Sequence, residues 1–216
     1  MPFDRIANLL SFIFLLMSFL LIIRNSLAAQ VRMFAVQSGV LTALAAVVAY
    51  FGGSGELFGV AVVFAVIKVI MIPNVLNRAV TKIGIQKAVA PYLGTSMTLA
   101  ICAGLVVVAF YVMAPVTASK RLPTGDGIPL AFAAFLIGFF TTVNRRRALT
   151  QILGFLMLEN SIFMIALLAT YGVPLIVEMG VFLDVLAAVL ILEVFVYRIR
   201  DNFESIDVKQ MGSLRG

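Results

Sequence analysis

Long apolar stretches alternate with short polar ones along almost the whole chain. Seven stretches approach the about 20 residues that a helix needs to cross the hydrocarbon core of a bilayer, and they occupy residues 6–23, 33–51, 57–76, 93–116, 128–143, 149–171 and 176–197. They are continuously apolar and do not alternate with a period of two, which favours helices over the strands of a membrane barrel. The pattern predicts an all-α integral membrane protein with about seven transmembrane helices.

The first stretch has a second interpretation, as a signal peptide, because Ser26, Leu27 and Ala28 resemble a small-residue cleavage site. The apolar region of a signal peptide usually has about 7–15 residues and follows a positively charged leader. Here the apolar run covers 18 residues, and Asp4 balances Arg5 before it. We therefore expect the stretch to remain in the protein as its first helix.

Composition excludes several kinds of function. Hydrophobic residues make up 62% of the 216 residues and charged residues only 12%, against about a quarter charged in an ordinary soluble domain. The chain has no His and a single cysteine, Cys102, so it lacks the usual ligands of haem, iron–sulfur clusters and zinc. Catalysis through a histidine base is impossible, and no phosphate-binding glycine loop is found. We expect no catalytic site and no cofactor in this chain.

Lys and Arg are distributed unequally between the two sides that seven helices would create. Cytoplasmic loops are enriched in these residues. One side would hold only three of the sixteen, whereas the other would hold twelve: Arg24, Arg32, Arg78, Lys82, Lys87, Arg145, Arg146, Arg147, Arg198, Arg200, Lys209 and Arg215. This predicts a cytoplasmic C-terminus and an N-terminus outside, with the run 145–147 anchoring the topology against anionic headgroups. The net charge of +6 is then a topology signal and does not indicate nucleic-acid binding.

Several charged residues fall inside the predicted helices. A charge at the bilayer centre costs about 2.5–3.5 kcal/mol on insertion scales, so it usually faces the bundle interior and pairs or conducts. The candidates for a proton path are Lys68, Glu159, Asp184 and Glu193, with Glu178 and Asn160 as secondary candidates. Asp184 and Glu193 are nine positions apart and face opposite sides of one helix, so one of them is free to point at a neighbouring subunit. The structural alternative is that Lys68 pairs with Glu159 or Asp184 and locks three helices together.

The segment around Glu159 resembles a known family. It reads NRRRALTQILGFLMLENS from Asn144 to Ser161, and it is similar to the arginine-pair, glycine and glutamate segment of the small three-helix membrane subunit of respiratory complex I. Residues 206–216 resemble that subunit's cytoplasmic tail. With four further helices in front, the whole chain resembles the hydrogenase-4 component E family, membrane subunits of energy-converting hydrogenase and formate hydrogenlyase complexes. The family glutamate of complex I falls on Leu156, three residues before Glu159.

The resemblance implies an N-terminal four-helix membrane extension (1–127), a three-helix module like the complex I subunit (128–200) and a cytoplasmic tail (201–216). It implies a non-redox subunit in the cytoplasmic membrane of a prokaryote, seated between a hydrogenase-proximal membrane subunit and antiporter-like subunits. Its buried charges would contribute to redox-coupled proton or sodium translocation. Nickel–iron (NiFe) and iron–sulfur centres would belong to partner subunits.

Two other functions remain open at this point. A similar small subunit occurs in multi-subunit cation/proton antiporters, where no hydrogenase is involved. The chain could also be a passive membrane scaffold that only seats antiporter-like neighbours. Copurifying subunits would separate the first alternative from the hydrogenase function, and substitution of the buried charges would separate the second.

Overall fold

The computed structural model describes residues 2–24, 26–83, 92–118 and 125–170. The elements in these ranges are α1 (Pro2–Ile23), α2 (Leu27–Gly52), α3 (Gly55–Phe64), the π-helical segment η1 (Ala65–Met71), α4 (Ile72–Ile83), α5 (Thr95–Ala118), the short 3-10 turn η2 (Gly125–Gly127), α6 (Ile128–Asn144) and α7 (Ala148–Thr170). Since α3, η1 and α4 follow one another without a break, they form one long helix. The described part of the chain therefore consists of six helices.

The all-α prediction is confirmed for the described residues, which contain six of the seven predicted helices. Five of them are long and apolar enough to cross a membrane, and α6 is a shorter apolar helix of 17 residues. The seventh predicted helix, 176–197, lies outside the described residues, and so do Asp184, Glu193 and Glu178. The chain is thus a helical integral membrane protein, and its orientation in the membrane stays a prediction.

The second helix begins earlier than predicted. Its start is near Leu27 and not near residue 33, because the Ser26 hydroxyl accepts a hydrogen bond from the Ala29 N–H at 3.1 Å and caps the first turn. Arg32 consequently lies on α2, although the sequence pattern had placed it in a loop. Ser26, which resembles part of a cleavage site in the sequence, serves here as a helix cap.

The third helix continues through Pro73 to Ile83 and does not end near residue 76. Proline has no N–H, and its ring clashes with the carbonyl four residues earlier in a regular α-helix. Directly before Pro73 the helix widens into η1, and the Ile72 N–H bonds to the Ile67 carbonyl five residues back. This wider turn is the local adjustment by which the helix passes the proline. As a result, Arg78 and Lys82 also lie on a helix, α4.

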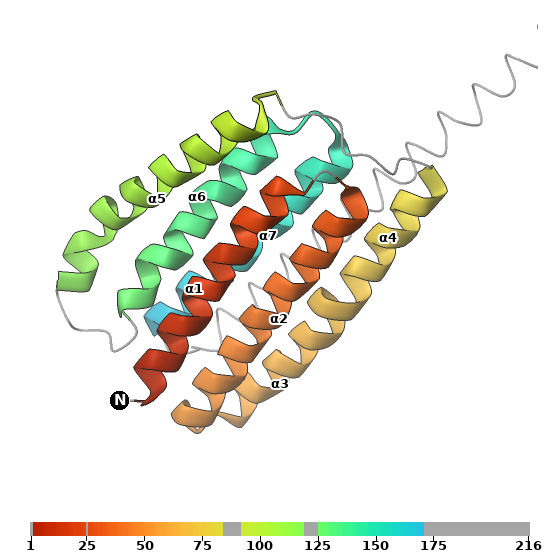
Figure 1. Ribbon diagram of the computed structural model, residues 1–216. Helices are drawn as coiled ribbons and strands as arrows, with labels where there is room; N and C mark the ends of the chain where they lie inside the picture. Colours follow the sequence, from red (N-terminus) through yellow and green to blue (C-terminus); the bar gives the residue numbers. More distant parts are fainter. Residues whose placement is uncertain (1, 25, 84–91, 119–124, 171–216) are drawn as a thin grey trace, which may run out of the picture.

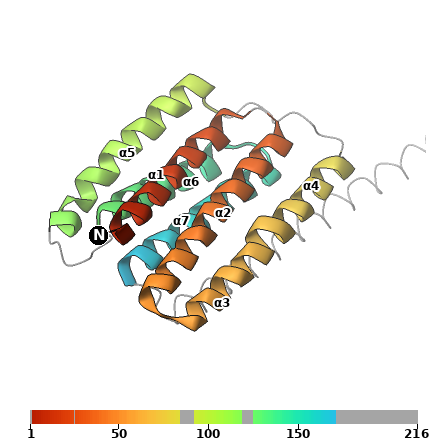
Figure 2. The same ribbon diagram turned by 60° about the horizontal axis from the view of Figure 1, so that its bottom comes forward.

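The helices lie side by side along a common direction (Figure 1). α5 forms one flank of the bundle and the α3, η1 and α4 helix forms the other, with α1, α2, α6 and α7 between them (Figure 2). The turn from α1 to α2, the end of α4 and the turn from α6 to α7 share one end of the bundle. The connection from α2 to α3 and the start of α6 lie at the opposite end.

Glycine allows α6 and α7 to cross closely, and this pair of helices shares the largest interface in the described part. A Cβ atom at Gly138 would stand 2.8 Å from the Leu158 backbone nitrogen, and one at Gly154 would stand 2.7 Å from the Thr142 backbone nitrogen. Neither distance is possible for a real side chain, so both positions require glycine. Close approach of backbones over small residues is typical of helix packing in membranes. It fixes α7, which carries Glu159, in the interior of the bundle.

Candidate functional site: a buried lysine and glutamate pair

Lys68 lies at the midpoint of its helix and points into the core. It is 13 residues from either end of the span Gly55–Thr81, about 20 Å at 1.5 Å per residue. Its buried neighbours on the same helix include Leu57, Ala61 and Phe64 on one side and Ile72 on the other. This spacing of three and four residues forms one stripe that faces the other helices. Lys68 therefore occupies a core position, and only 1% of its side chain is exposed.

Glu159 lies at the midpoint of α7, eleven residues from either end of the helix, and Asn160 is the next residue. α7 is the most buried of the five long helices, which is why two consecutive polar residues can both point into the protein. Glu159 is 2% exposed and Asn160 is fully buried. The helix crossing at Gly154 keeps this part of α7 next to the centre of the bundle.

Lys68, Glu159 and Asn160 meet in the core. The Lys68 Nζ donates hydrogen bonds to Glu159 Oε1 at 2.9 Å and to Asn160 Oδ1 at 3.1 Å. We call Lys68 and Glu159 the central pair. A buried ion pair is tolerated only with good geometry and additional hydrogen bonds, and the amide of Asn160 supplies one of these. The pair joins the helix of residues 55–83 to α7, across 91 positions of sequence.

Aromatic rings close the site on its apolar side. The Lys68 Nζ stands 5.2 Å from the centroid of the Phe64 ring, within the range of a cation–π interaction. Phe64 in turn packs edge-to-face on Phe163, with centroids 4.3 Å apart. Both rings come from the same two helices as the central pair and lie about one turn from it. They are buried themselves and cover the charged groups on that side with aromatic surface.

The polar contacts continue from the central pair across α2 to α1. Asn160 Nδ2 donates to Ser38 Oγ at 2.9 Å. The neighbouring residue on α2, Gln37, donates through Nε2 to Ser18 Oγ at 2.7 Å, and the Ser18 hydroxyl donates to the Phe14 carbonyl at 3.1 Å. The donor directions follow from chemistry: the Lys68 ammonium can only donate, so it fixes Oδ1 of Asn160 toward itself and Nδ2 toward Ser38. Four helices are thus connected through buried polar groups.

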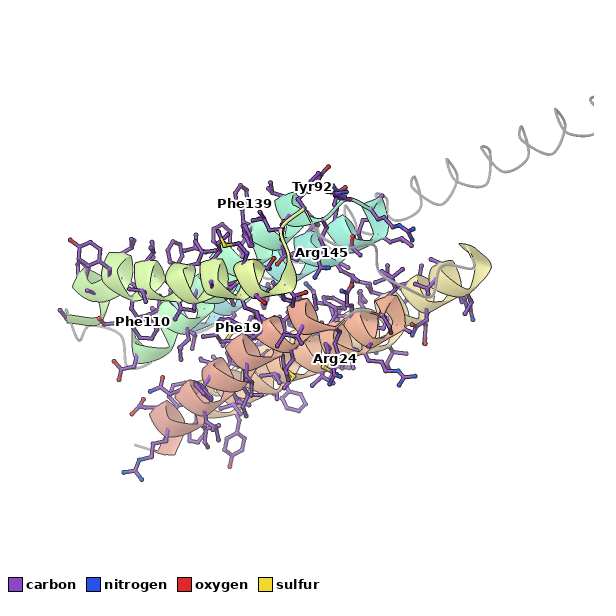
Figure 3. All side chains as sticks on the ribbon, turned by 45° about the horizontal axis from the view of Figure 1, so that its top comes forward. Phe19, Arg24, Tyr92, Phe110, Phe139 and Arg145 are labelled. Atoms are coloured by element: carbon purple, nitrogen blue, oxygen red, sulfur yellow. The ribbon has the colours of Figure 1, made fainter. Side chains whose placement is uncertain are left out.

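A second polar cluster joins helices at the end of the bundle where α6 meets α7. Asn144 Nδ2 donates to Thr98 Oγ1 at 3.0 Å, and its Oδ1 accepts from the Leu93 N–H at 3.1 Å, which ties α6 to the start of α5. Arg145 donates through NH2 to the carbonyl of Ile22 at 3.2 Å, which ties this end to α1. Figure 3 shows Arg145 at the same end of the bundle as Arg24.

The position of Arg145 differs from the headgroup anchor that the sequence predicted. Only 5% of it is exposed, because it packs between α1, α5 and α6 and donates to a backbone carbonyl. Burial lowers the pKa of its guanidinium, and Cys102 raises it by a smaller amount; arginine remains protonated all the same. Its neighbour Arg146 is exposed and stacks over the Tyr92 ring at 4.6 Å. Of the three arginines in the run, Arg145 therefore makes a structural contact and Arg146 is a surface cation.

The structure brings together three of the six candidate residues, namely Lys68, Glu159 and Asn160, and the other three lie outside the described residues. Sequence reasoning missed Ser38, Gln37 and Ser18. Their signal was present, since a glutamine and serines inside otherwise apolar helices need partners, but serine often bonds to its own helix four residues back, as Ser18 does. Only the packing of α1, α2 and α7 showed that Ser38 contacts Asn160 and that Gln37 contacts Ser18.

These features define a class: a helical membrane protein that carries a hydrogen-bonded pair of opposite charges at mid-depth. Comparison with known proteins assigns the chain to a family. It is 36% identical over 201 residues, 93% of this chain and 91% of the relative, to the uncharacterized protein Rv0085 of Mycobacterium tuberculosis, and it belongs to the same family.

A more distant relationship extends over the full length. The chain is 26% identical over 217 residues to hydrogenase-4 component E of Escherichia coli and of Shigella flexneri, covering 99% of both chains. It is therefore homologous to that protein from one end to the other. No protein-family profile matches the chain, and no solved structure matches it.

Proposed function

We propose that this protein is a non-redox membrane subunit of a hydrogenase-4-like complex related to respiratory complex I, and that its central pair takes part in redox-coupled proton or sodium movement. The observation that carries the proposal is the contact of Lys68 with both Glu159 and Asn160 at the midpoint of two membrane-length helices. The full-length homology to hydrogenase-4 component E supports the choice of complex. Membership in such a complex would place the chain in the cytoplasmic membrane.

The chemistry of the site suits proton exchange. A carboxylate and an ammonium in contact can interconvert between the ionised pair and the neutral pair by transfer of one proton. Asn160 and the Phe64 ring hold the ammonium from two further sides, so Lys68 keeps its place when Glu159 takes up a proton. Nickel–iron and iron–sulfur centres, antiporter-like subunits and a hydrogenase-proximal membrane subunit would be supplied by partner chains. Asp184, Glu193 and Glu178 remain candidates for the continuation of the path.

The test is the variant Glu159→Gln in the native complex, with Glu56→Gln as its control. The amide of glutamine keeps the size and most hydrogen-bonding capacity of glutamate but cannot titrate, whereas Glu56 is exposed in the first turn of α3. We expect Glu159→Gln to copurify with the same partners as wild type and to lose at least tenfold in coupled ion translocation. Glu56→Gln should leave both unchanged. A passive scaffold predicts either failed assembly or normal translocation in Glu159→Gln.

Mass spectrometry of the purified complex identifies the partners independently. Copurified hydrogenase subunits support the proposal. Antiporter-like subunits alone, without a hydrogenase, would assign the chain to a cation/proton antiporter, and the role of the central pair would then be tested in that complex.

A further inference from the structure

We propose that Gln37 holds an ordered water in the core of the bundle, and that this water, with Ser18 and Ser38, forms a hydrated branch through which the central pair exchanges protons. The inference rests on the proposed function, because it adds a route to the same site. Gln37 lies on α2 at the level of the pair and is fully buried. It is not one of the charged candidates for the proton path, and it lies outside the segment from Asn144 to Ser161 that resembles the complex I subunit.

The Gln37 side chain carries a buried acceptor without a donor among the described residues. Gln37 Nε2 donates to Ser18 Oγ at 2.7 Å, but its carbonyl atom Oε1 is buried and has no hydrogen-bond partner among the described residues. A buried amide oxygen without a donor loses the hydrogen bond that water gives it in the unfolded chain, and nothing replaces that bond. The Ser18 hydroxyl donates to the Phe14 carbonyl at 3.1 Å and accepts from Gln37 Nε2, which leaves Oε1 as the open acceptor of the amide. Since no donor among the described residues reaches Oε1, we assign this role to a water molecule.

The residue next to Gln37 on α2 contacts the site of the central pair. Ser38, the next residue on α2, accepts from Asn160 Nδ2 at 2.9 Å, and the other end of the same amide accepts from Lys68 at 3.1 Å. Ser38 and Lys68 therefore stand on opposite atoms of one side-chain amide, a span that about one or two waters bridge. The amide of Asn160 orients the groups but does not carry protons, whereas serine hydroxyls and water both accept and donate. Gln37 and Asn160 act as positioning residues.

The first experiment detects the water. The full chain in lipid nanodiscs is exposed to X-ray-generated hydroxyl radicals in ¹⁸O water, and the labelling of Phe14 and Phe34 is measured by mass spectrometry. Both rings are fully buried; Phe14 is one turn from Ser18 and Phe34 is one turn from Gln37 on the same helix faces. We expect both to be labelled in wild type and to lose at least threefold in labelling rate in Gln37→Leu. If the labelling of Phe14 and Phe34 in wild type does not rise above background, the proposal is overturned.

The second experiment asks whether the branch is used. Gln37→Leu is compared with Gln30→Leu in the assembled complex, since Gln30 is an equally buried glutamine on α2 that bonds to the Arg24 carbonyl, away from the pair. We expect coupled translocation to fall at least fivefold in Gln37→Leu and to stay normal in Gln30→Leu. Ser18→Ala, a smaller change, should lower translocation in the same direction and replaces Gln37→Leu if that variant does not assemble.

The outcomes separate this inference from the proposed function. Loss of translocation in Glu159→Gln together with normal translocation in Gln37→Leu and Ser18→Ala rejects the branch and keeps the function of the central pair. Normal translocation in all three rejects both. If Phe14 and Phe34 are labelled in wild type but translocation is unchanged in Gln37→Leu, the water is present but has only a structural role. This outcome also rejects the branch.

Discussion

A lysine at the midpoint of an apolar helix costs about 2.5–3.5 kcal/mol on insertion scales before its partners are counted. Lys68 meets a carboxylate, an amide oxygen and an aromatic face within one site. A hydrophobic residue of similar volume would fill the same space without any desolvation cost. The retention of a complete polar site at such a depth therefore favours a role for the pair beyond holding helices together.

Removal of Lys68 alone should cost more than removal of both members of the central pair. Lys68→Met takes the ammonium away from a buried carboxylate, and we expect it to lower the free energy of unfolding by about 3–5 kcal/mol. Glu159→Gln should cost less, because the amide oxygen still accepts from Lys68. The double variant should recover part of the loss. A double-mutant cycle on unfolding in lipid nanodiscs measures the coupling.

The control for this cycle is Arg78→Met, which removes an exposed cation from the same long helix. It should change stability by less than about 0.5 kcal/mol. Strictly additive effects of Lys68→Met and Glu159→Gln would contradict the contact between the two residues.

At the level of the helices, the site depends on two departures from regular packing. The π-helical segment η1 carries Lys68 directly before Pro73, and π-turns inside α-helices are frequent at functional sites. The glycines Gly138 and Gly154 bring α6 and α7 into backbone contact. Because α7 carries both Glu159 and Asn160, the distance from α6 decides where these two acceptors stand relative to Lys68.

Gly154→Ala should separate α6 from α7. A Cβ at this position would stand 2.7 Å from the backbone of Thr142, so the backbone must move, at a cost of about 1–3 kcal/mol. Gly104→Ala on α5 is the matched control, since a Cβ there meets nothing within 4 Å and alanine favours the helix. Thermal unfolding should show a lower midpoint for Gly154→Ala and an equal or higher one for Gly104→Ala. Equal midpoints in the two variants would count against the close crossing.

At the scale of the whole molecule, the described charges at one end of the bundle are basic, and those at the other end are mostly acidic. The end formed by the α1 to α2 turn, the end of α4 and the α6 to α7 turn carries Arg24, Arg78, Lys82, Arg145, Arg146 and Arg147. The described charges at the opposite end are Asp4, Arg5, Glu56 and Asp126. By the rule that positive loops stay inside, this distribution predicts that the basic end faces the cytoplasm.

A topology experiment follows from this separation. A cysteine introduced at Asp126 should react with a membrane-impermeant maleimide added outside intact cells, whereas one at Arg24 should react only after the membrane is opened. A reporter fused after Gly216 should be active only in a form that functions in the cytoplasm. The background variant is Cys102→Ala, which removes the chain's only cysteine, a buried one. Labelling of Arg24→Cys from outside would reverse the orientation.

Much of the fold could be predicted from the sequence, because lipid imposes simple requirements on length and polarity. Six of the predicted helices are present in the described residues, with Lys68 and Glu159 at their midpoints. Boundaries at polar flanks were less predictable. The sequence pattern places Arg32 and Arg78 in loops, but both lie on helices. The Ser26 cap lets α2 begin before its apolar stretch, and the π-turn before Pro73 lets the third helix continue beyond its own.

By itself, then, the sequence determined the number of described spans, the depth of the charges and the basic bias of one end, since these follow from distance along the chain and the cost of charge in lipid. Only the tertiary structure decided that Lys68 pairs with Glu159 and Asn160, that Asn160 reaches Ser38, that Gln37 pairs with Ser18, and that Arg145 is buried. Side-chain partners from different helices depend on helix rotation and separation. Packing at Gly138 and Gly154 and the wide turn before Pro73 set both, across distances that local sequence patterns do not encode.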